Sequence, residues 1–362
     1  MEAIFSTYNW TIAITIIGVL YAIYLSTKST DELIAGEKPS ILPVLFMGLV
    51  AIYIGTRPLW CYADTNLYTM MFHLVQNGYW ESFKDAEQEP IWTYIANIHV
   101  KHADASTWLL TISTVYVGGM TYAAYKWLPR HFFIAVIFLL TAFSFWGYAT
   151  NGIRHGMATS IALISLTFFN QSKHKLVVAY SFLAIASLIH TSILLVVASV
   201  TMALFLKCTK RNVYIWLICI VLSFILQEPL KVFMSTIIND SRMTNYLMNM
   251  EDSKNLFSVT GFRWDFIIYS SIPIILGLYT IVQKGLTDKI YSLLLNTYIF
   301  SNAFWVLINS AAYSNRFAYL SWFLFPILIA YPICKFRIFP RQGIVACLIL
   351  FISIAFTFVM QI

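Results

Sequence analysis

Residues 175–207 read KLVVAYSFLAIASLIHTSILLVVASVTMALFLK, and the way this stretch crosses a membrane decides the topology of the whole chain. A membrane-spanning helix needs about 20 apolar residues. The stretch therefore forms either one long tilted helix or two short helices that meet at His190. With two helices, most lysines and arginines fall on the cytoplasmic side, as in membrane proteins generally. With one helix, every later segment is inverted and this bias disappears. We therefore expect two helices, with His190 at the external surface.

Composition is typical of a protein that crosses the membrane many times. The chain has 362 residues, of which 59% are hydrophobic and 11% charged, values outside the range of soluble domains. The formal net charge of +7 comes from basic loops rather than from a basic patch on a soluble fold, so no nucleic-acid partner is expected. The first apolar run, near Trp10, lacks the features of a signal peptide and should remain as the first span.

Windows of spanning length predict an all-α polytopic integral membrane protein with about 12 transmembrane helices, in a single transmembrane domain over residues 1–362. Two long loops, residues 57–105 and 228–261, fall on the external side, whereas the cytoplasmic loops are short and basic. Function is therefore expected outside. The expected spans are residues 8–26, 40–56, 106–127, 131–149, 152–170, 175–189, 191–206, 213–227, 262–283, 288–309, 316–335 and 342–361.

Short amphipathic helices are expected in both external loops, lying on the membrane surface. In the first loop, Asp64 or Thr65 can cap a helix that ends near Asn77 and Gly78. A second helix opens with proline directly after Glu89, since proline is favoured at the first helical position. The loop over residues 228–261 carries a shorter pattern of the same kind.

Arginines recur at the external edges of the spans, on the side that should be poor in positive charge. The start of a helix favours anions over cations, so an arginine there has little structural value. Guanidinium groups bind phosphate oxygens bidentately, and the cluster therefore predicts an anionic ligand such as phosphate or pyrophosphate. No nucleotide-binding glycine motif is present, which argues against a soluble sugar nucleotide as the donor substrate. The arginines are Arg57, Arg154, Arg242, Arg263 and Arg316.

Polar and aromatic residues accompany these arginines, and we interpret them as candidate substrate-binding groups. Asn151, Arg154 and His155 share one helical face, as do Asp64 and Tyr68. The candidates beside the arginines are Asn151, His155, Tyr68, Tyr246, Asp265 and Asn315.

Structural roles are open as alternatives for several of these residues. Arg57 and Asp64 can serve as a surface ion pair and a helix cap, and Arg263 and Asp265 as a local ion pair. His190 can be a satisfied structural histidine. No cysteine pairing with the spacing of a metal or redox motif is found, so neither a metal site nor a cofactor is expected.

Taken in order, the motifs resemble those of the EpsG family of Wzy-like bacterial polysaccharide polymerases. One departure is His155, where the family often has glutamine. The matching pieces are Arg57…Asp64-x-x-x-Tyr68-x-x-x-Phe72, Glu89-Pro90-Ile91-Trp92, Asn151-x-x-Arg154, His190-x-Ser192, Arg242-x-x-x-Tyr246 and Asn315-Arg316-Phe317.

This resemblance implies a metal-independent glycosyltransferase with a fold similar to the GT-C class, in the cytoplasmic membrane of a bacterium. Such an enzyme moves a growing glycan from a polyprenyl-pyrophosphate carrier to a lipid-linked repeat unit on the external, or periplasmic, face. The product would be an O-antigen, a capsule or an exopolysaccharide. Expected partners are the polyprenyl-pyrophosphate-linked oligosaccharide, the lipid bilayer, a chain-length regulator and a flippase.

A pyrophosphate leaving group can be stabilised by fixed guanidinium groups without a metal. We expect Arg154, Arg242 and Arg316 in this role, with Arg57 and Arg263 in reserve.

A base must also activate the acceptor hydroxyl, and His190, Asp64 and Glu89 are the candidates. Asp64 and Glu89 could instead bind sugar hydroxyls, and Asp265 could orient Arg263.

Other functions remain as alternatives. A glycan ligase of the same fold would move one finished chain, and a membrane O-acyltransferase would also use external histidine and arginine. A transporter of polysaccharide or lipid-linked sugar would place its charges and broken helices near the bilayer midplane, whereas these charges gather at one face.

Overall fold

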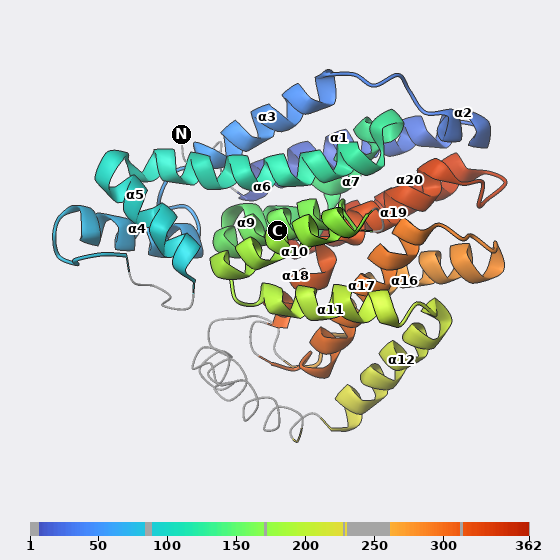
Figure 1. The fold of residues 1–362 in the computed structure, drawn as a ribbon. Coiled ribbons are helices and arrows are strands. Elements are labelled where there is room, and N and C mark those ends of the chain that lie inside the picture. Colours follow the sequence, from blue (N-terminus) through green and yellow to red (C-terminus); the bar gives the residue numbers. More distant parts are fainter. Residues whose placement is uncertain are drawn as a thin grey trace. The chain divides into compact units, whose positions relative to one another are not determined.

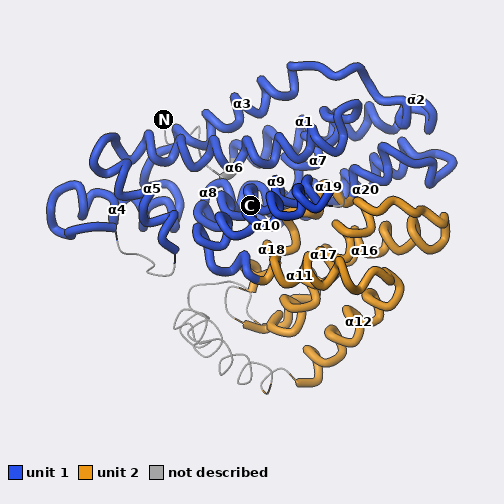
Figure 2. Tube along the Cα trace, viewed as in Figure 1, with its two compact units in different colours: residues 1–194, 329–362 blue, residues 195–328 orange. Residues whose placement is uncertain are grey.

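The computed structural model describes residues 7–83, 89–169, 172–226, 229, 261–311 and 314–361, and these residues form helices without strands (Figure 1). The chain divides into two compact units (Figure 2). Unit 1 contains Met1–Leu194 and Ile329–Ile362, and unit 2 contains Leu195–Leu328.

Unit 1 is a set of helices, long and short, that pack in pairs. The main packed pairs are α1 with α20, α3 with α6, α6 with α9, and α9 with α10. Its helices are α1 (Thr7–Thr27), α2 (Thr30–Ala35), α3 (Leu42–Gly55), α4 (Ala63–Gln76), α5 (Pro90–His102), α6 (Ala105–Trp127), η2 (Pro129–His131), α7 (Phe132–Thr141), α8 (Phe143–Thr150), α9 (Ile153–Leu166), α10 (Lys173–Ile189) and α20 (Gln342–Gln361).

Glycines allow the closest of these helix contacts. A Cβ atom added to Gly119 of α6 would lie 2.8 Å from Ser160 Cβ of α9, and one added to Gly18 of α1 would lie 2.7 Å from Ile354 Cδ1 of α20. Small residues permit such approach in membrane bundles, where packing rather than exclusion of water holds helices together.

Unit 2 is built around buried polar contacts between helices. Asn302 donates to the hydroxyls of Ser270 and Ser321 at 3.1 and 2.9 Å, and Trp216 Nε1 donates to Asn302 Oδ1 at 2.7 Å. Hydrogen bonds of this kind fix helix pairs in apolar surroundings. The helices are α12 (Thr209–Ile225), α16 (Trp264–Leu278), η3 (Tyr279–Gln283), α17 (Lys289–Leu307) and α18 (Ser314–Trp322); α11 (Ile193–Phe205) and α19 (Phe325–Lys335) include the unit boundaries.

Each predicted span coincides with a helix or with two helices in succession. Within the described ranges, five helices are long and apolar enough to cross a membrane alone: Asn9–Thr27, Trp264–Gln283, Lys289–Leu307, Ser314–Lys335 and Gln342–Gln361. A sixth is obtained when the bent pair Ala105–Trp127 and Pro129–Thr141 counts as one span. The fold is therefore an apolar helical protein with five or six candidate spans, and the number of about 12 stays a prediction.

The segment predicted as one span over residues 131–149 is broken at Ala142, where the backbone is extended. The carbonyls released by the break still have donors. Thr141 accepts hydrogen bonds from the hydroxyls of Ser353 and Thr357 on α20, and Leu140 accepts one from Trp146 Nε1. Backbone groups in an apolar setting require such partners.

The two-helix prediction for residues 175–207 is confirmed as a break in the chain. Helix α10 ends at Ile189, α11 begins at Ile193, and His190 between them is extended with φ −149° and ψ 117°. The side of the membrane that His190 faces stays a prediction.

Both helices expected in the first loop are present, with one correction at the start of α4. The N-cap of α4 is Tyr62, and neither Asp64 nor Thr65 caps the helix. Thr65 lies inside the helix, and its hydroxyl contacts Arg57 and the carbonyl of Thr150. Helix α5 begins as predicted, with Glu89 at the N-cap and Pro90 at its first position. The helix expected within residues 228–261 lies outside the described residues.

Candidate active site

A fully buried carboxylate, that of Glu89, joins three segments of unit 1. Its Oε1 accepts hydrogen bonds from His190 Nδ1 at 2.8 Å, from the backbone N–H of Thr191 at 3.1 Å and from the Thr191 hydroxyl at 3.2 Å. Its Oε2 lies 2.8 Å from an Arg154 guanidinium nitrogen. The start of α5, the start of α9 and the α10–α11 turn are thereby held together at one side chain.

Electrostatics keep Glu89 ionised. Burial by itself raises the pKa of a carboxyl group, but the hydrogen bond and charge of His190, the charge of Arg154 and the Thr191 N–H together lower the pKa of Glu89 to about 2. An ionised carboxylate only accepts hydrogen bonds. Donors must therefore face it from all three of these residues.

This constraint fixes the orientation of His190. Because Glu89 only accepts, the Nδ1 atom of His190 carries the proton that it donates, and the neutral ring then presents Nε2 as an acceptor. The His190 side chain is 18% exposed, whereas Glu89 is 0% exposed. The histidine is thus the accessible member of the pair, and the glutamate supports it from behind.

Arg154 lies in the first turn of α9 and is held on two sides. One guanidinium nitrogen contacts Glu89, and Cζ lies 5.6 Å from the centre of the Tyr68 ring and 5.8 Å from that of Trp92. Cation–π contacts at such distances favour a fixed guanidinium. The side chain is 10% exposed, so its position is set before any ligand arrives.

His155, the next residue, packs between two rings of the same region. Its imidazole centre is 4.6 Å from that of His190 and 5.0 Å from that of Tyr148, and its Nε2 lies 3.3 Å from the Ser192 hydroxyl. Both residues of the His190-x-Ser192 motif therefore contact His155.

Arg57 is buried just after the end of α3. Its Nε and one terminal nitrogen donate to the Thr65 hydroxyl at 3.1 and 2.9 Å, and the other donates to the carbonyl of Ile54 at 2.6 Å. Thr65 donates in turn to the carbonyl of Thr150, just before α9. Burial lowers the pKa of the Arg57 guanidinium to about 10, which leaves it charged at neutral pH. Arg57 thus joins the end of α3 to α4 and to the entry of α9.

An aromatic cluster fixes α4 and α5 against α6. Trp92 and Trp108 are fully buried with ring centres 5.3 Å apart, and Tyr68 contacts both of them. Phe72 stacks on Trp108 from the other side. Since Tyr68 and Trp92 also contact Arg154, this packing sets the position of the guanidinium.

The remaining candidates of unit 1 lie near this cluster in sequence. Asp64 is half-buried in the first turn of α4, where a negative charge suits the helix dipole. Asn151 is exposed and ends α8, two residues before α9 begins.

Unit 2 contains a second group of candidates. Arg263 and Asp265 form a bidentate pair, with nitrogen–oxygen distances of 2.9 and 2.5 Å, and Arg263 Cζ lies 3.6 Å from the centre of the Phe266 ring. The local ion pair considered from the sequence is therefore present. Asn315 hydrogen-bonds Tyr319, and the charges of Arg316 and Arg263 both act on that residue.

Each unit thus contains its own set of the sequence candidates. Arg57, Tyr68, Glu89, Arg154, His155 and His190 meet in unit 1, and Arg263, Asp265, Asn315 and Arg316 lie in unit 2. Arg242 and Tyr246 lie outside the described residues.

Some supporting residues were not found from the sequence. No spacing rule singles out Thr150 or Trp108, and the sequence predicts Thr65 only as a possible helix cap. Within the described ranges, no group of three or more His, Cys, Asp or Glu side chains is arranged to hold a metal ion.

Comparison with known proteins agrees with these motifs. The family model described as "EpsG family" matches residues 40–362, a range that contains all the candidate site residues of both units. Comparison with curated proteins and with solved structures gives no match. Because the matched range is most of the chain, the protein belongs to the EpsG family, which indicates a membrane protein of polysaccharide polymerase type.

Proposed function

We propose that this protein is a polysaccharide polymerase that transfers a growing glycan from a polyprenyl-pyrophosphate carrier to a lipid-linked repeat unit. One observation carries the proposal beyond family membership. A buried, ionised Glu89 holds a histidine and an arginine at 2.8 Å each, so a base and an anion-binding group share one anchor.

His190 is the proposed general base. The acceptor sugar hydroxyl attacks the anomeric carbon of the donor glycan, and its proton passes to His190 Nε2 as the new C–O bond forms. Glu89 accepts from Nδ1 and stabilises the positive charge that develops on the ring. Glu89 has no accessible surface, so we assign it as a positioning residue rather than as the base.

Arg154 is the proposed partner of the leaving group. The bond between the anomeric carbon and pyrophosphate breaks, and the electron pair leaves with the polyprenyl pyrophosphate. A guanidinium fixed in advance stabilises this growing charge, since no reorganisation is needed at the moment of reaction. Arg316 and Arg242 are further candidates for this role.

Arg57 and Arg263 fit supporting roles better. Arg57 is 4% exposed and its nitrogens donate to Thr65 and Ile54, and Arg263 is paired bidentately with Asp265. We assign Arg57 to the positioning of α4 and α9. Asp64 and Asn151, with His155 and Tyr68, line or support the substrate site in this proposal.

The finer features expected from the sequence belong to the same proposal. They are about 12 membrane crossings in a GT-C-like arrangement, an active site facing the periplasm or exterior of a bacterial cytoplasmic membrane, and transfer without a metal. A chain-length regulator and a flippase are the proposed protein partners. The excess of basic residues in the expected cytoplasmic loops supports the orientation.

The test is a transfer reaction with purified protein in nanodiscs and a lipid-pyrophosphate repeat unit, with products separated on a gel. A ladder of multimers with release of free polyprenyl pyrophosphate is expected. His190→Gln should abolish the ladder, and the matched control His102→Gln, an exposed histidine at the end of α5, should leave it intact. Transfer of a single preformed chain would instead identify a ligase, and a folded protein that leaves the matched substrate monomeric would refute the polymerase.

A further inference from the structure

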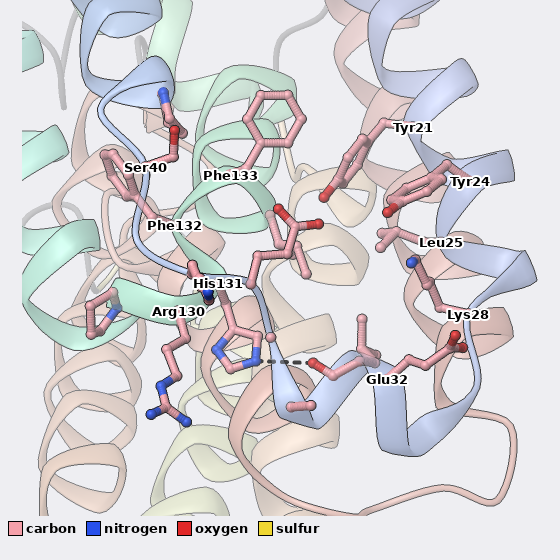
Figure 3. A pocket seen from close by; sticks show the side chains of 18 residues that line it. Tyr21, Tyr24, Leu25, Lys28, Glu32, Ser40, Arg130, His131, Phe132 and Phe133 are labelled. Atoms are coloured by element: carbon pink, nitrogen blue, oxygen red, sulfur yellow. Dashed lines mark hydrogen bonds between the residues drawn. The ribbon is translucent and has the colours of Figure 1, made fainter.

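A cavity of about 260 Å³ whose lining includes charged side chains lies in unit 1, and it shares no residue with the proposed active site. It opens where α1 ends, and its other walls are α2, the linker to α3, and the turn between α6 and α7. Figure 3 shows Tyr21 and Tyr24 of α1 on one side together with Lys28, which follows α1, and Arg130 and His131 across the opening. The sequence predicts that this side is cytoplasmic.

The walls of this cavity are held by backbone contacts. Gly36 has φ +65°, a conformation that favours glycine, and a Cβ atom there would lie 2.7 Å from the Arg130 carbonyl. The next N–H, that of Glu37, donates to the same carbonyl at 2.7 Å. His131 Nε2 donates to the carbonyl of Leu33 at 3.0 Å, the contact drawn in Figure 3. The α2–α3 linker is therefore fixed against the α6–α7 turn.

Helix α2 is also tied to the C-terminal part of the unit. Ser29 and Glu32 form a reciprocal capping box at its start. The Thr30 hydroxyl donates to the carbonyl of Pro340 at 2.8 Å and accepts from the N–H of Gln342 at 3.1 Å. The position of α2, which lines the cavity, is thus fixed by contacts with a segment distant in sequence.

The cavity lining carries both signs of charge. Lys28, Lys38 and Arg130 supply cations, and Glu32 and Glu37 supply carboxylates. The ammonium of Lys28 lies 4.8 Å from the centre of the Tyr24 ring. Lys28 and Glu37 both line the cavity, so opposite charges lie within reach of one ligand.

Such a lining matches a small zwitterion at a membrane surface. Lys28 follows directly on the candidate span Asn9–Thr27, so the cavity borders the expected hydrocarbon region. Tyrosines are enriched at this depth, and basic pockets there bind lipid headgroups. Sites for drug-sized ligands measure about 300–1,000 Å³, and this smaller cavity suits a headgroup better than an oligosaccharide.

We propose that this cavity binds the headgroup of an aminophospholipid. The phosphate lies against Lys28, and the primary ammonium lies against Glu37 and the Tyr21 ring. The proposal is independent of the polymerase activity, because it concerns a different set of residues.

Native mass spectrometry of the purified full-length chain tests this assignment. The probes are dihexanoyl phosphatidylethanolamine, dihexanoyl phosphatidylglycerol and soluble O-phosphoethanolamine. The ethanolamine lipid should bind most tightly. Lys28→Gln should weaken its binding by about 3–10-fold, as expected for a partly exposed charged contact, whereas Lys126→Gln, an exposed lysine outside the cavity, should not.

The Glu37→Gln variant tests the preference for one lipid over the other. The substitution should not disturb the fold, because the side chain is exposed and the structural contact is made by the backbone N–H of this residue. It should remove the preference for ethanolamine over glycerol lipid and leave phosphatidylglycerol binding unchanged. Equal binding of the two lipids by the unmodified chain would overturn the assignment. So would O-phosphoethanolamine binding as tightly as the lipid, or an equal loss in Lys126→Gln.

Discussion

Glu89→Gln tests the central contact of the proposed active site with almost no change of shape. The amide keeps one oxygen for His190 and Thr191, but its nitrogen replaces the oxygen that faces Arg154. Two donors then face each other at the former ion pair. The substitution also removes the negative charge that supports a positive His190.

The size of the effect follows from the carboxylate's environment. The folded protein lowers the pKa of Glu89 from 4.5 to about 2. Since a tenfold change in proton affinity is worth about 1.4 kcal/mol, the ionised form is favoured by on the order of 3 kcal/mol. Removing one partner of a buried ion pair costs a similar ~3–5 kcal/mol. We expect a loss of stability of ~2–4 kcal/mol and, from impaired proton transfer, a rate lowered by about 10²–10⁴-fold.

The assay separates these two effects. Thermal unfolding in detergent gives the loss of stability, and single-turnover release of polyprenyl pyrophosphate by folded protein gives the rate. Glu89→Asp keeps the charge on a shorter side chain. Its stability and its rate should lie between those of the unmodified chain and those of Glu89→Gln. Glu81→Gln, an exposed carboxylate in the same loop, is the matched control. A folded Glu89→Gln protein with the rate of the unmodified chain would refute the positioning role.

Further predictions concern the neighbouring residues and pH. Arg154→Lys keeps the charge but cannot bind pyrophosphate bidentately, so turnover should fall at least about tenfold, and normal polymer from this variant would remove its assigned role. Thr65→Val removes a hydroxyl that accepts from buried Arg57 and should cost ~1–3 kcal/mol in thermal unfolding; an unchanged midpoint would contradict the assigned contact. His190→Cys should react with an impermeant external thiol reagent in intact cells, and labelling only after permeabilisation would reverse the predicted orientation. Because the unfolded chain binds the Glu89 proton more tightly than the folded one, this stabilisation is complete above pH 4.5 and is lost as pH falls towards about 2. Acid titration followed by circular dichroism should show a smaller loss in Glu89→Gln, and identical acid profiles would contradict the depressed pKa.

Much of the helical layout is readable from the sequence because apolar run length sets helix length. The bounds of α1, α6 and α20 fall within one residue of their predicted spans. The break at Ala142 was not readable, since residues 131–149 form one apolar run without glycine or proline until Gly147. What stabilises that break is a set of donors on α20, more than 200 residues away.

The residues of the candidate site could be predicted from the sequence, but their arrangement in space could not. Arg154 and His190 stand out because a charged or titratable group at the end of an apolar span needs a reason, and Glu89 stands out because it precedes the proline that opens a loop helix. Their contact joins residues 101 positions apart, and nothing in local spacing reports it. The division of labour between base and positioning carboxylate follows only from burial, which leaves Glu89 enclosed and His190 accessible.

The roles of the neutral supporting residues were the hardest to predict from the sequence. The sequence indicates Thr65 only as a possible helix cap and does not indicate Thr150, yet these two residues connect Arg57 to the entry of α9. The aromatic contacts around Arg154 depend on how α4 and α5 pack on α6, a tertiary feature without a sequence period.

Chemical rescue of His190→Ala tests the central claim, that a histidine held by Glu89 is the base, most directly. Single-turnover release of polyprenyl pyrophosphate is measured in nanodiscs with and without added imidazole. The expected result is a rate lowered by about 10²–10⁴-fold, with a saturable recovery when imidazole fills the vacated space. A His190→Ala protein that reacts within about twofold of the unmodified chain would contradict the claim, since a general base contributes at least about 10²-fold.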